Sequence, residues 1–252
     1  MKIIQWIVRQ WLTASLGRWK IVSSVALLSL SVVVPGPSAQ GSTSTLAPEQ
    51  IITRMEQRYE HQLQALTSYQ GRRRYSVTGG VLGDPAYLLV EEQYGSQEGK
   101  QFRVLERGGS AQVEKRVFSR LLKAEQETSR DPAREAVELC RRNYNFTFVQ
   151  YDPAKGSYIF QVEPRTSNPY LLRGTIWVDA QDFAVRRIEG EPVVRQSSFV
   201  RQTHFIHEFA KFGEFWLPVR HRSETDLVLL GRAILEINYF DYQWQKRQEA
   251  HP

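Results

Sequence analysis

The histidines have the most versatile chemistry in this chain, because imidazole can transfer protons or bind metals. His204 and His207 lie three positions apart, a spacing that puts them on opposite faces of a strand and makes a poor metal pair. His207 and His221 could face each other across a hairpin, with Glu208 beside them. Ordinary polar strand positions are the simpler interpretation, so we expect no metal and no cofactor here.

Catalytic motifs are otherwise missing from the sequence. It contains no glycine-rich phosphate loop, no G-x-S-x-G and no H-E-x-x-H. Asp179 and Asp182 flank a turn, where aspartate usually bonds its own backbone. We therefore predict that the protein is not an enzyme, and a hydrolase that uses Asp179, His207 or Glu208 is kept as a third hypothesis.

The densest basic run is Arg72-Arg73-Arg74. On a strand its members divide between two faces, so the run forms no single patch. One interpretation is a solvated sheet edge, whose charges discourage aggregation. The other places Arg73 inside an apolar cavity, on the same face as Tyr75 and Val77, as the one polar cavity residue.

The apolar residues indicate which elements would position these groups. Six of them recur at helical spacing on one face: Ile51, Ile52, Met55, Tyr59, Leu63 and Leu66. This stripe predicts an amphipathic helix over residues 47–68, with Pro48 in its first turn. A second helical segment is expected from Pro132 to about Asn143.

Alternating apolar and polar residues dominate the chain after Tyr69 and predict roughly eleven strands. The expected strands are 70–78, 86–95, 100–107, 112–119, 146–151, 157–164, 170–179, 183–191, 198–212, 215–225 and 231–243. Short turns between consecutive strands indicate an antiparallel meander, and no βαβ alternation is present. The expected fold class is mainly β with α: a large curved antiparallel sheet whose apolar face is covered by the two helical segments.

Aromatic and aliphatic side chains of shared parity give this sheet an apolar inner face. Two helical segments are too little to fill it, which favours a cavity for a hydrocarbon ligand over a solid core. The candidate lining residues are Met55, Tyr59, Leu63, Tyr75, Tyr158, Phe160, Phe199, Phe205, Phe209, Leu217, Leu235, Ile237 and Tyr239.

Residues 1–39 have the pattern of an export signal. Basic residues precede the apolar segment Ile21–Val34, which is shorter than the roughly 20 residues of a spanning helix, and small residues follow. We predict a mature chain that begins between Gln40 and Ser44 and a periplasmic protein, with an uncleaved membrane anchor as the alternative. A linker (40–46), one domain (47–245) and a polar tail (246–252) would complete the chain.

Composition narrows the class of protein further. The 252 residues are 41% hydrophobic and 24% charged, which excludes a mostly disordered chain. The leader holds four of the 33 basic residues and none of the 27 acidic ones, so the formal charge of +6 falls to +2 without it. A nearly neutral chain gives no electrostatic reason to expect nucleic acid. The single cysteine, Cys140, excludes an internal disulfide.

Four stretches resemble bacterial outer-membrane lipoprotein-sorting proteins. They are LLRGTIWVD (171–179), VRRIEGEP (185–192), FWLP (215–218) and INYFDY (237–242). The resemblance covers roughly residues 145–243 and implies an incomplete β-barrel with helices as a lid, holding lipid acyl chains. Periplasmic carriers, an outer-membrane receptor and a stress-sensing regulator share that architecture. The chain departs from the receptor type because it lacks a lipid-anchoring cysteine after the leader.

Two functional hypotheses follow from the leader, the apolar sheet face and the resemblance. The first is a non-enzymatic periplasmic protein that carries lipid, or the acyl chains of lipoproteins, during sorting to the outer membrane. The alternative is an envelope regulatory or interaction module that binds a membrane-protein partner. Fold does not decide between them.

Overall fold

The computed structural model describes residues 46–79, 85–129, 135–168, 170–194, 200–229 and 231–246. The expected signal peptide, its cleavage site and Phe199 lie outside these residues, as does the tail after Lys246. None of the described helices is both long enough and apolar enough to cross a membrane.

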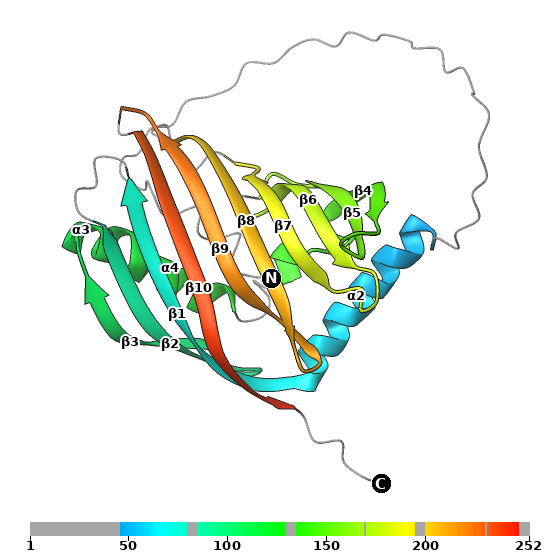
Figure 1. Cartoon of the computed structure of the whole chain (residues 1–252), viewed down its shortest axis with the longest axis horizontal. Coiled ribbons are helices and arrows are strands. Elements are labelled where there is room, and N and C mark those ends of the chain that lie inside the picture. Colours follow the sequence, from blue (N-terminus) through cyan, green and yellow to red (C-terminus); the bar gives the residue numbers. More distant parts are fainter. Residues whose placement is uncertain are drawn as a thin grey trace.

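The described residues form one ten-stranded antiparallel sheet that curves around a concave face (Figure 1). Its order is β3-β2-β1-β10-β9-β8-β7-β6-β5-β4, and the edge strands β3 and β4 are not paired with each other in this part of the chain. The expected fold class is thereby confirmed, because the sheet is an open, incomplete barrel. The strands are β1 (Leu66–Gly79), β2 (Ala86–Gly95), β3 (Gly99–Gly108), β4 (Tyr144–Asp152), β5 (Ser157–Pro164), β6 (Leu172–Asp179), β7 (Val185–Pro192), β8 (Val200–Phe212), β9 (Phe215–Leu227) and β10 (Gly231–Lys246).

The first and last strands lie side by side in the middle of the sheet. β1 pairs with β10 in antiparallel register, with Arg73 opposite Tyr239 and Tyr75 opposite Ile237. The sheet therefore consists of two meanders, β1–β3 and β4–β10, which this pairing joins. Sequence alternation predicts the strands but carries no signal for the pairing between the two ends of the chain.

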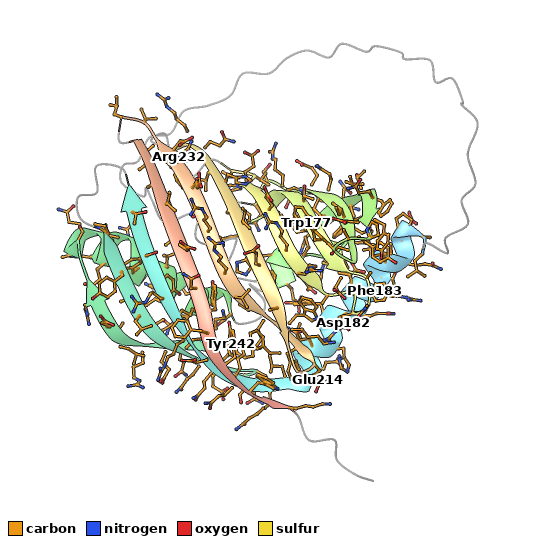
Figure 2. The ribbon with its side chains drawn as sticks, in the orientation of Figure 1. Trp177, Asp182, Phe183, Glu214, Arg232 and Tyr242 are labelled. Carbon is orange, nitrogen blue, oxygen red and sulfur yellow. The ribbon has the colours of Figure 1, made fainter. Side chains whose placement is uncertain are left out.

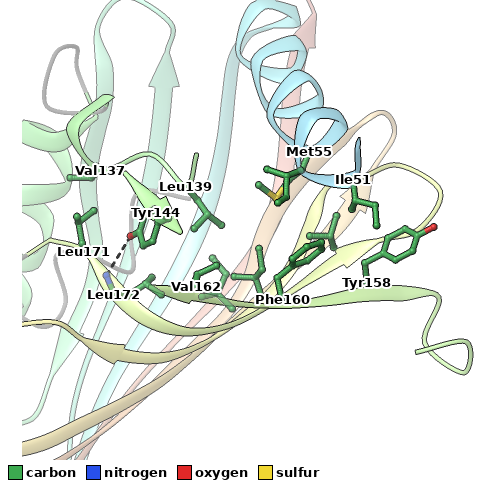
Figure 3. Packing of buried hydrophobic residues seen from close by; sticks show 14 of the residues in the cluster. Ile51, Met55, Val137, Leu139, Tyr144, Tyr158, Phe160, Val162, Leu171 and Leu172 are labelled. Atoms are coloured by element: carbon green, nitrogen blue, oxygen red, sulfur yellow. Dashed lines mark hydrogen bonds between the residues drawn. The ribbon is translucent and has the colours of Figure 1, made fainter. Parts of the chain in front are cut away.

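Helix α2 (Pro48–Ala65) covers the concave face near β4–β7 (Figures 1 and 3). It starts at Pro48 as expected and ends three residues early, because Leu66 already belongs to β1. Ile51 and Met55 of its first half are buried among strand residues such as Phe160. The amphipathic stripe thus meets the apolar face of the sheet, as its spacing predicts.

The expected strand 112–119 is wrong, because these residues are helical. Helix α3 (Ala111–Val113), a π-helical turn (Glu114–Phe118) and α4 (Ser119–Thr128) follow one another directly. Val113, Val117 and Leu121 recur every four residues, and this spacing places all three on one helical face. They are buried against the concave face of β1, β2 and β10, so this segment is a second cover.

The expected helix from Pro132 to Asn143 is also incorrect in its described part. Residues Glu135–Val137 form a short 3-10 turn, and bends and turns continue to Asn143. The Asn143 side chain donates hydrogen bonds to the carbonyls of Glu135 and Glu138, at 2.9 and 2.8 Å. Those bonds favour a compact turn over a regular helix. Leu139 is buried in the core beneath α2.

The two faces of the sheet differ sharply in burial, and β5 and β6 show the contrast. Phe160 is fully buried in the core beneath α2 (Figure 3), whereas Trp177 is half-buried on the convex face (Figure 2). There the Arg187 guanidinium carbon lies 5.2 Å from the centre of the Trp177 ring.

We expect Phe160→Ala to lower the free energy of unfolding by about 3–5 kcal/mol, because it leaves a cavity in a packed core. Trp177→Ala, the control of similar size, should cost roughly 1 kcal/mol because its ring already meets solvent. Urea unfolding of both variants measures the difference. Equal losses would contradict the assignment of the two faces.

Candidate functional site

The concave face brings most of the expected lining residues together, divided between two covered regions. Beneath α2 the core contains Met55, Tyr158, Phe160 and Phe205, with Phe209 packed against it. Beneath α3 and α4 it contains Tyr75, Leu235, Ile237 and Tyr239. Leu217 belongs to a third, smaller cluster with Leu66, Tyr69 and Phe215. Much of the expected cavity lining is therefore packed core in this state.

Two crevices remain between the second half of α2 and the sheet. Their volumes are about 50 and 80 Å³, and Tyr59, Gln62 and Trp216 line both of them. Met55 and Phe209 line the smaller crevice, whereas Leu63 and Leu217 line the larger one. Binding pockets for small molecules usually measure about 300–1,000 Å³, so neither crevice admits a long chain as it stands.

The two halves of α2 are attached to the sheet in different ways. The first half is held by apolar packing, with Ile51 0% and Met55 3% exposed. The second half is held mainly by polar contacts at the β8–β9 turn, near Glu214 in Figure 2. Gln62 exchanges two hydrogen bonds with the Trp216 backbone, at 3.0 and 2.9 Å, and Arg58 donates to the Glu214 carbonyl.

A buried ionic network fastens the other cover, α4. Arg73 points inward and is 1% exposed, which is the second of the two placements that the sequence allowed. Its guanidinium donates to Glu92 at 2.5 Å and to Glu125 of α4 at 2.7 Å. Lys100 of β3 lies 3.0 Å from Glu92 and 3.3 Å from Glu125. Two cations and two carboxylates therefore share one site, and their formal charges cancel.

Neighbouring charges keep Glu92 and Arg73 of this network ionised. Burial alone would raise the pKa of Glu92, but Arg73 and Lys100 outweigh that effect and lower it to about 2. Burial would also lower the pKa of Arg73, whereas Glu125 and Glu92 raise it well above its usual value. Tyr69 adds a hydrogen bond to Glu92 at 2.8 Å. Such a network is stable only while all of its members are present.

Sequence reasoning identified Arg73 but missed its three charged partners. Glu92 and Lys100 share the inward parity of apolar neighbours such as Val90, and Glu125 follows Leu121 by one helical turn. Their positions on apolar faces were the available signal, because a charge there must be paired.

His207 and His221 meet as the hairpin geometry suggested. Both are fully buried, and their Nδ1 atoms lie 3.2 Å apart. Neither Nε2 atom has a hydrogen-bond partner among the described residues. Burial lowers the pKa of both imidazoles, to about 3 for His221, so the pair is neutral at pH 7.

The positions of Glu208 and Asp179 do not support the metal and hydrolase hypotheses. Glu208 lies on the other face of β8, where its carboxylate accepts a 2.8 Å hydrogen bond from Arg187. Asp179 accepts bonds from the backbone N–H groups of Gln181 and Asp182, at 3.0 and 2.9 Å. The described part of the chain contains no group of three or more histidine, cysteine or acidic residues suited to a metal ion.

Comparison with known proteins finds similarity only among solved structures. No protein-family model matches the sequence, and no curated protein matches it. A LolA superfamily protein from Nitrosomonas europaea is 10% identical, with a TM-score of 0.44, over 81% of this chain and 96% of that one. A putative outer membrane lipoprotein-sorting protein domain from Vibrio parahaemolyticus is 10% identical, with a TM-score of 0.43, over 80% and 95%.

A DUF1329 family protein from Desulfovibrio piger is 12% identical, with a TM-score of 0.40, over 77% of this chain and 90% of that one. Lipoprotein-sorting proteins, the group that the four sequence stretches resemble, are thus among the solved structures to which this chain is similar. At these identities the similarity concerns the fold alone.

The ionic network predicts a large difference between neighbouring arginines. Arg73→Met should lower the free energy of unfolding by about 3–5 kcal/mol, because two buried carboxylates would share a single cation. Arg74→Met is the control, since Arg74 is exposed and lies 3.9 Å from an equally exposed Glu106. Arg74→Met should lower the free energy of unfolding by no more than about 1 kcal/mol. Similar urea midpoints for the two variants would contradict the buried network.

The histidine pair predicts a pH dependence of stability. Because the folded-state pKa values are lowered, the unfolded chain binds more protons below pH 6.5, and stability falls as the pH falls from 6.5 towards 3. Between pH 6.5 and 4.5 the His221 imidazole, whose pKa is lowered to about 3, should contribute a loss of about 2–3 kcal/mol, and His207 should act in the same direction. Unfolding of His207→Phe/His221→Phe should lose this slope, whereas the exposed His204→Gln control should keep it. An unchanged slope in the double variant would refute the assignment.

Proposed function

We propose that this protein binds a long hydrocarbon chain, such as the acyl chain of a lipid or lipoprotein, between α2 and the concave face of the sheet. The observation that carries the proposal is the pair of crevices beneath the second half of α2. Five residues expected to line a hydrocarbon site lie around them: Met55, Tyr59, Leu63, Phe209 and Leu217.

Movement of α2 supplies the volume that the closed state lacks. Tyr59 and Gln62 line both crevices, so displacement of these two side chains would join them into one groove. The bonds that must break include the two between Gln62 and the Trp216 backbone and the one that Arg58 donates to the Glu214 carbonyl. Each typically contributes only about 0.5–1.5 kcal/mol net, or somewhat more for the charged donor. Burial of an acyl chain contributes about 0.8 kcal/mol per methylene, so a few buried methylenes offset the free energy lost with these hydrogen bonds.

Helix α4 is the fixed cover in this mechanism. Glu125 binds both Arg73 and Lys100 inside the sheet, and all three side chains are less than one-tenth exposed. Lifting α4 would leave these charges buried without their partner, at a cost of several kcal/mol. The acyl chain therefore enters at α2, whose second half is attached to the β8–β9 turn by hydrogen bonds and not by a buried ion pair of the described residues.

The cellular role follows from the leader as well as from the groove. With an export signal, a protein that binds acyl chains would work in the periplasm, and carriage of lipid or lipoprotein towards the outer membrane fits both features. An envelope interaction module with a membrane-protein partner is the alternative. It would use the same fold without taking up lipid.

Binding of a fluorescent long-chain fatty acid tests the proposal. Leu63→Asp should weaken binding about tenfold or more, because it places a charge in the groove. Gln62→Ala should speed uptake, because it removes both bonds to Trp216. Gln57→Ala is the matched control, an exposed glutamine on the same helix. Absence of saturable binding by the wild-type chain would favour the interaction module.

A further inference from the structure

A second hollow lies on the opposite, convex face of the sheet, lined by residues near the start of β1 and the end of β10. Figure 1 shows these two strand ends side by side. Its volume is about 480 Å³, far larger than either crevice beneath α2. The side chains that alternate with its glutamines, such as Glu92 and Lys100, are buried on the concave side. The hollow is therefore separate from the proposed acyl-chain groove.

Four glutamines cross this face in one row. Gln243 of β10 is opposite Gln70 of β1, which is opposite Gln93 of β2, which in turn is opposite Gln101 of β3. All four are exposed. Because neighbouring strands are about 4.8 Å apart, the row presents one side-chain amide about every 4.8 Å across the strands.

The next row explains why the surface is hollowed beside the glutamines. Ser68 pairs with Gly95, and Gly95 pairs with Gly99, so two of three adjacent positions lack a side chain, and the Glu98 side chain lies over Gly95. Gln245 closes this row at β10 and accepts a hydrogen bond from the Ser68 hydroxyl at 3.2 Å. The result is a shallow trough with amides along one wall.

Charges next to the trough are already paired with each other. On the other side of the glutamine row, Arg72 lies 3.4 Å from Asp241, and Arg103 lies 2.8 Å from Glu91. Glu98, which lies over Gly95, is the one acidic or basic side chain among the trough residues. A row of amides, each with donors and an acceptor, suits a neutral ligand whose groups also donate and accept.

We propose that the trough binds an extended neutral glycan that lies across the strands. Sugar hydroxyls both donate and accept hydrogen bonds, and one pyranose unit of an extended chain is about as long as the ~4.8 Å strand spacing. An extended peptide matches less well, because its same-side groups repeat only every ~6.6 Å. Successive sugar units can therefore each meet one glutamine.

Calorimetric titration with three probes tests the assignment: cellotetraose, which is extended, maltotetraose, which is curved, and a neutral glutamine- and serine-rich peptide. Cellotetraose should bind saturably, and the other two at least about tenfold more weakly. No saturable binding of cellotetraose, or equal or tighter binding of the curved sugar or the peptide, would overturn the proposal.

Variants locate the binding. Gln70→Ala/Gln93→Ala should weaken cellotetraose binding about tenfold or more, because two amides at the centre of the row are lost. Gln161→Ala is the control, an exposed glutamine on the convex face of β5. Both changes are at exposed positions, and thermal melting checks that each variant is folded. Equal affinities of the double variant and the control would also overturn the proposal.

Discussion

An open, curved sheet has an apolar concave face that must be kept from water, and the rest of this structure follows from that constraint. A closed barrel would bury the face by itself, but β3 and β4 are unpaired with each other in the described chain. Two helical segments keep water from the concave face instead: α2 covers the β4–β7 side, and α3–α4 covers the β1–β3 side. Because the covers are separate, they can be fastened with different strengths.

Polar groups on the concave face determine how strongly each cover is attached to the sheet. The network of Arg73, Glu92, Lys100 and Glu125 ties α4 to three strands through charges that cannot be separated cheaply. Among the described residues, no buried ion pair holds the second half of α2, which rests on hydrogen bonds to the β9 end of a hairpin. A rigid cover beside a weakly held one suits the proposed reversible uptake of a hydrocarbon chain. The buried charges contribute more to this asymmetry than to overall stability.

Local sequence signals predicted the strands well and the connections poorly. Residues 86–95 and 157–164 form strands with the expected bounds, because alternation and flanking turn residues are both local. Residues 112–119 were mistaken for a strand because valine and phenylalanine favour strands, although the four-residue spacing of Val113, Val117 and Leu121 favours a helix. The β1–β10 pairing is non-local, so no short motif reports it.

The candidate site shows the same limit. Parity identified the inward aromatic residues and allowed Arg73 to point inward, but its partners come from β2, β3 and α4, which only the tertiary fold brings together. Parity also could not show how much of the concave face is filled. The answer depends on how closely Tyr59 and Leu63 approach the sheet, and that is set by packing.

The central claim is that α2 moves while α4 stays in place when a chain is bound. Spin labels on Gln64→Cys and Gln161→Cys, in a Cys140→Ser background, report the distance from the second half of α2 to the convex face of β5. Labels on Glu127→Cys and Gln161→Cys, in the same background, report the distance from α4 to the convex face of β5. With saturating palmitate, the account predicts that the first distance distribution shifts to longer values and the second does not change. A first distribution unchanged by bound palmitate, or a shift confined to α4, would contradict it.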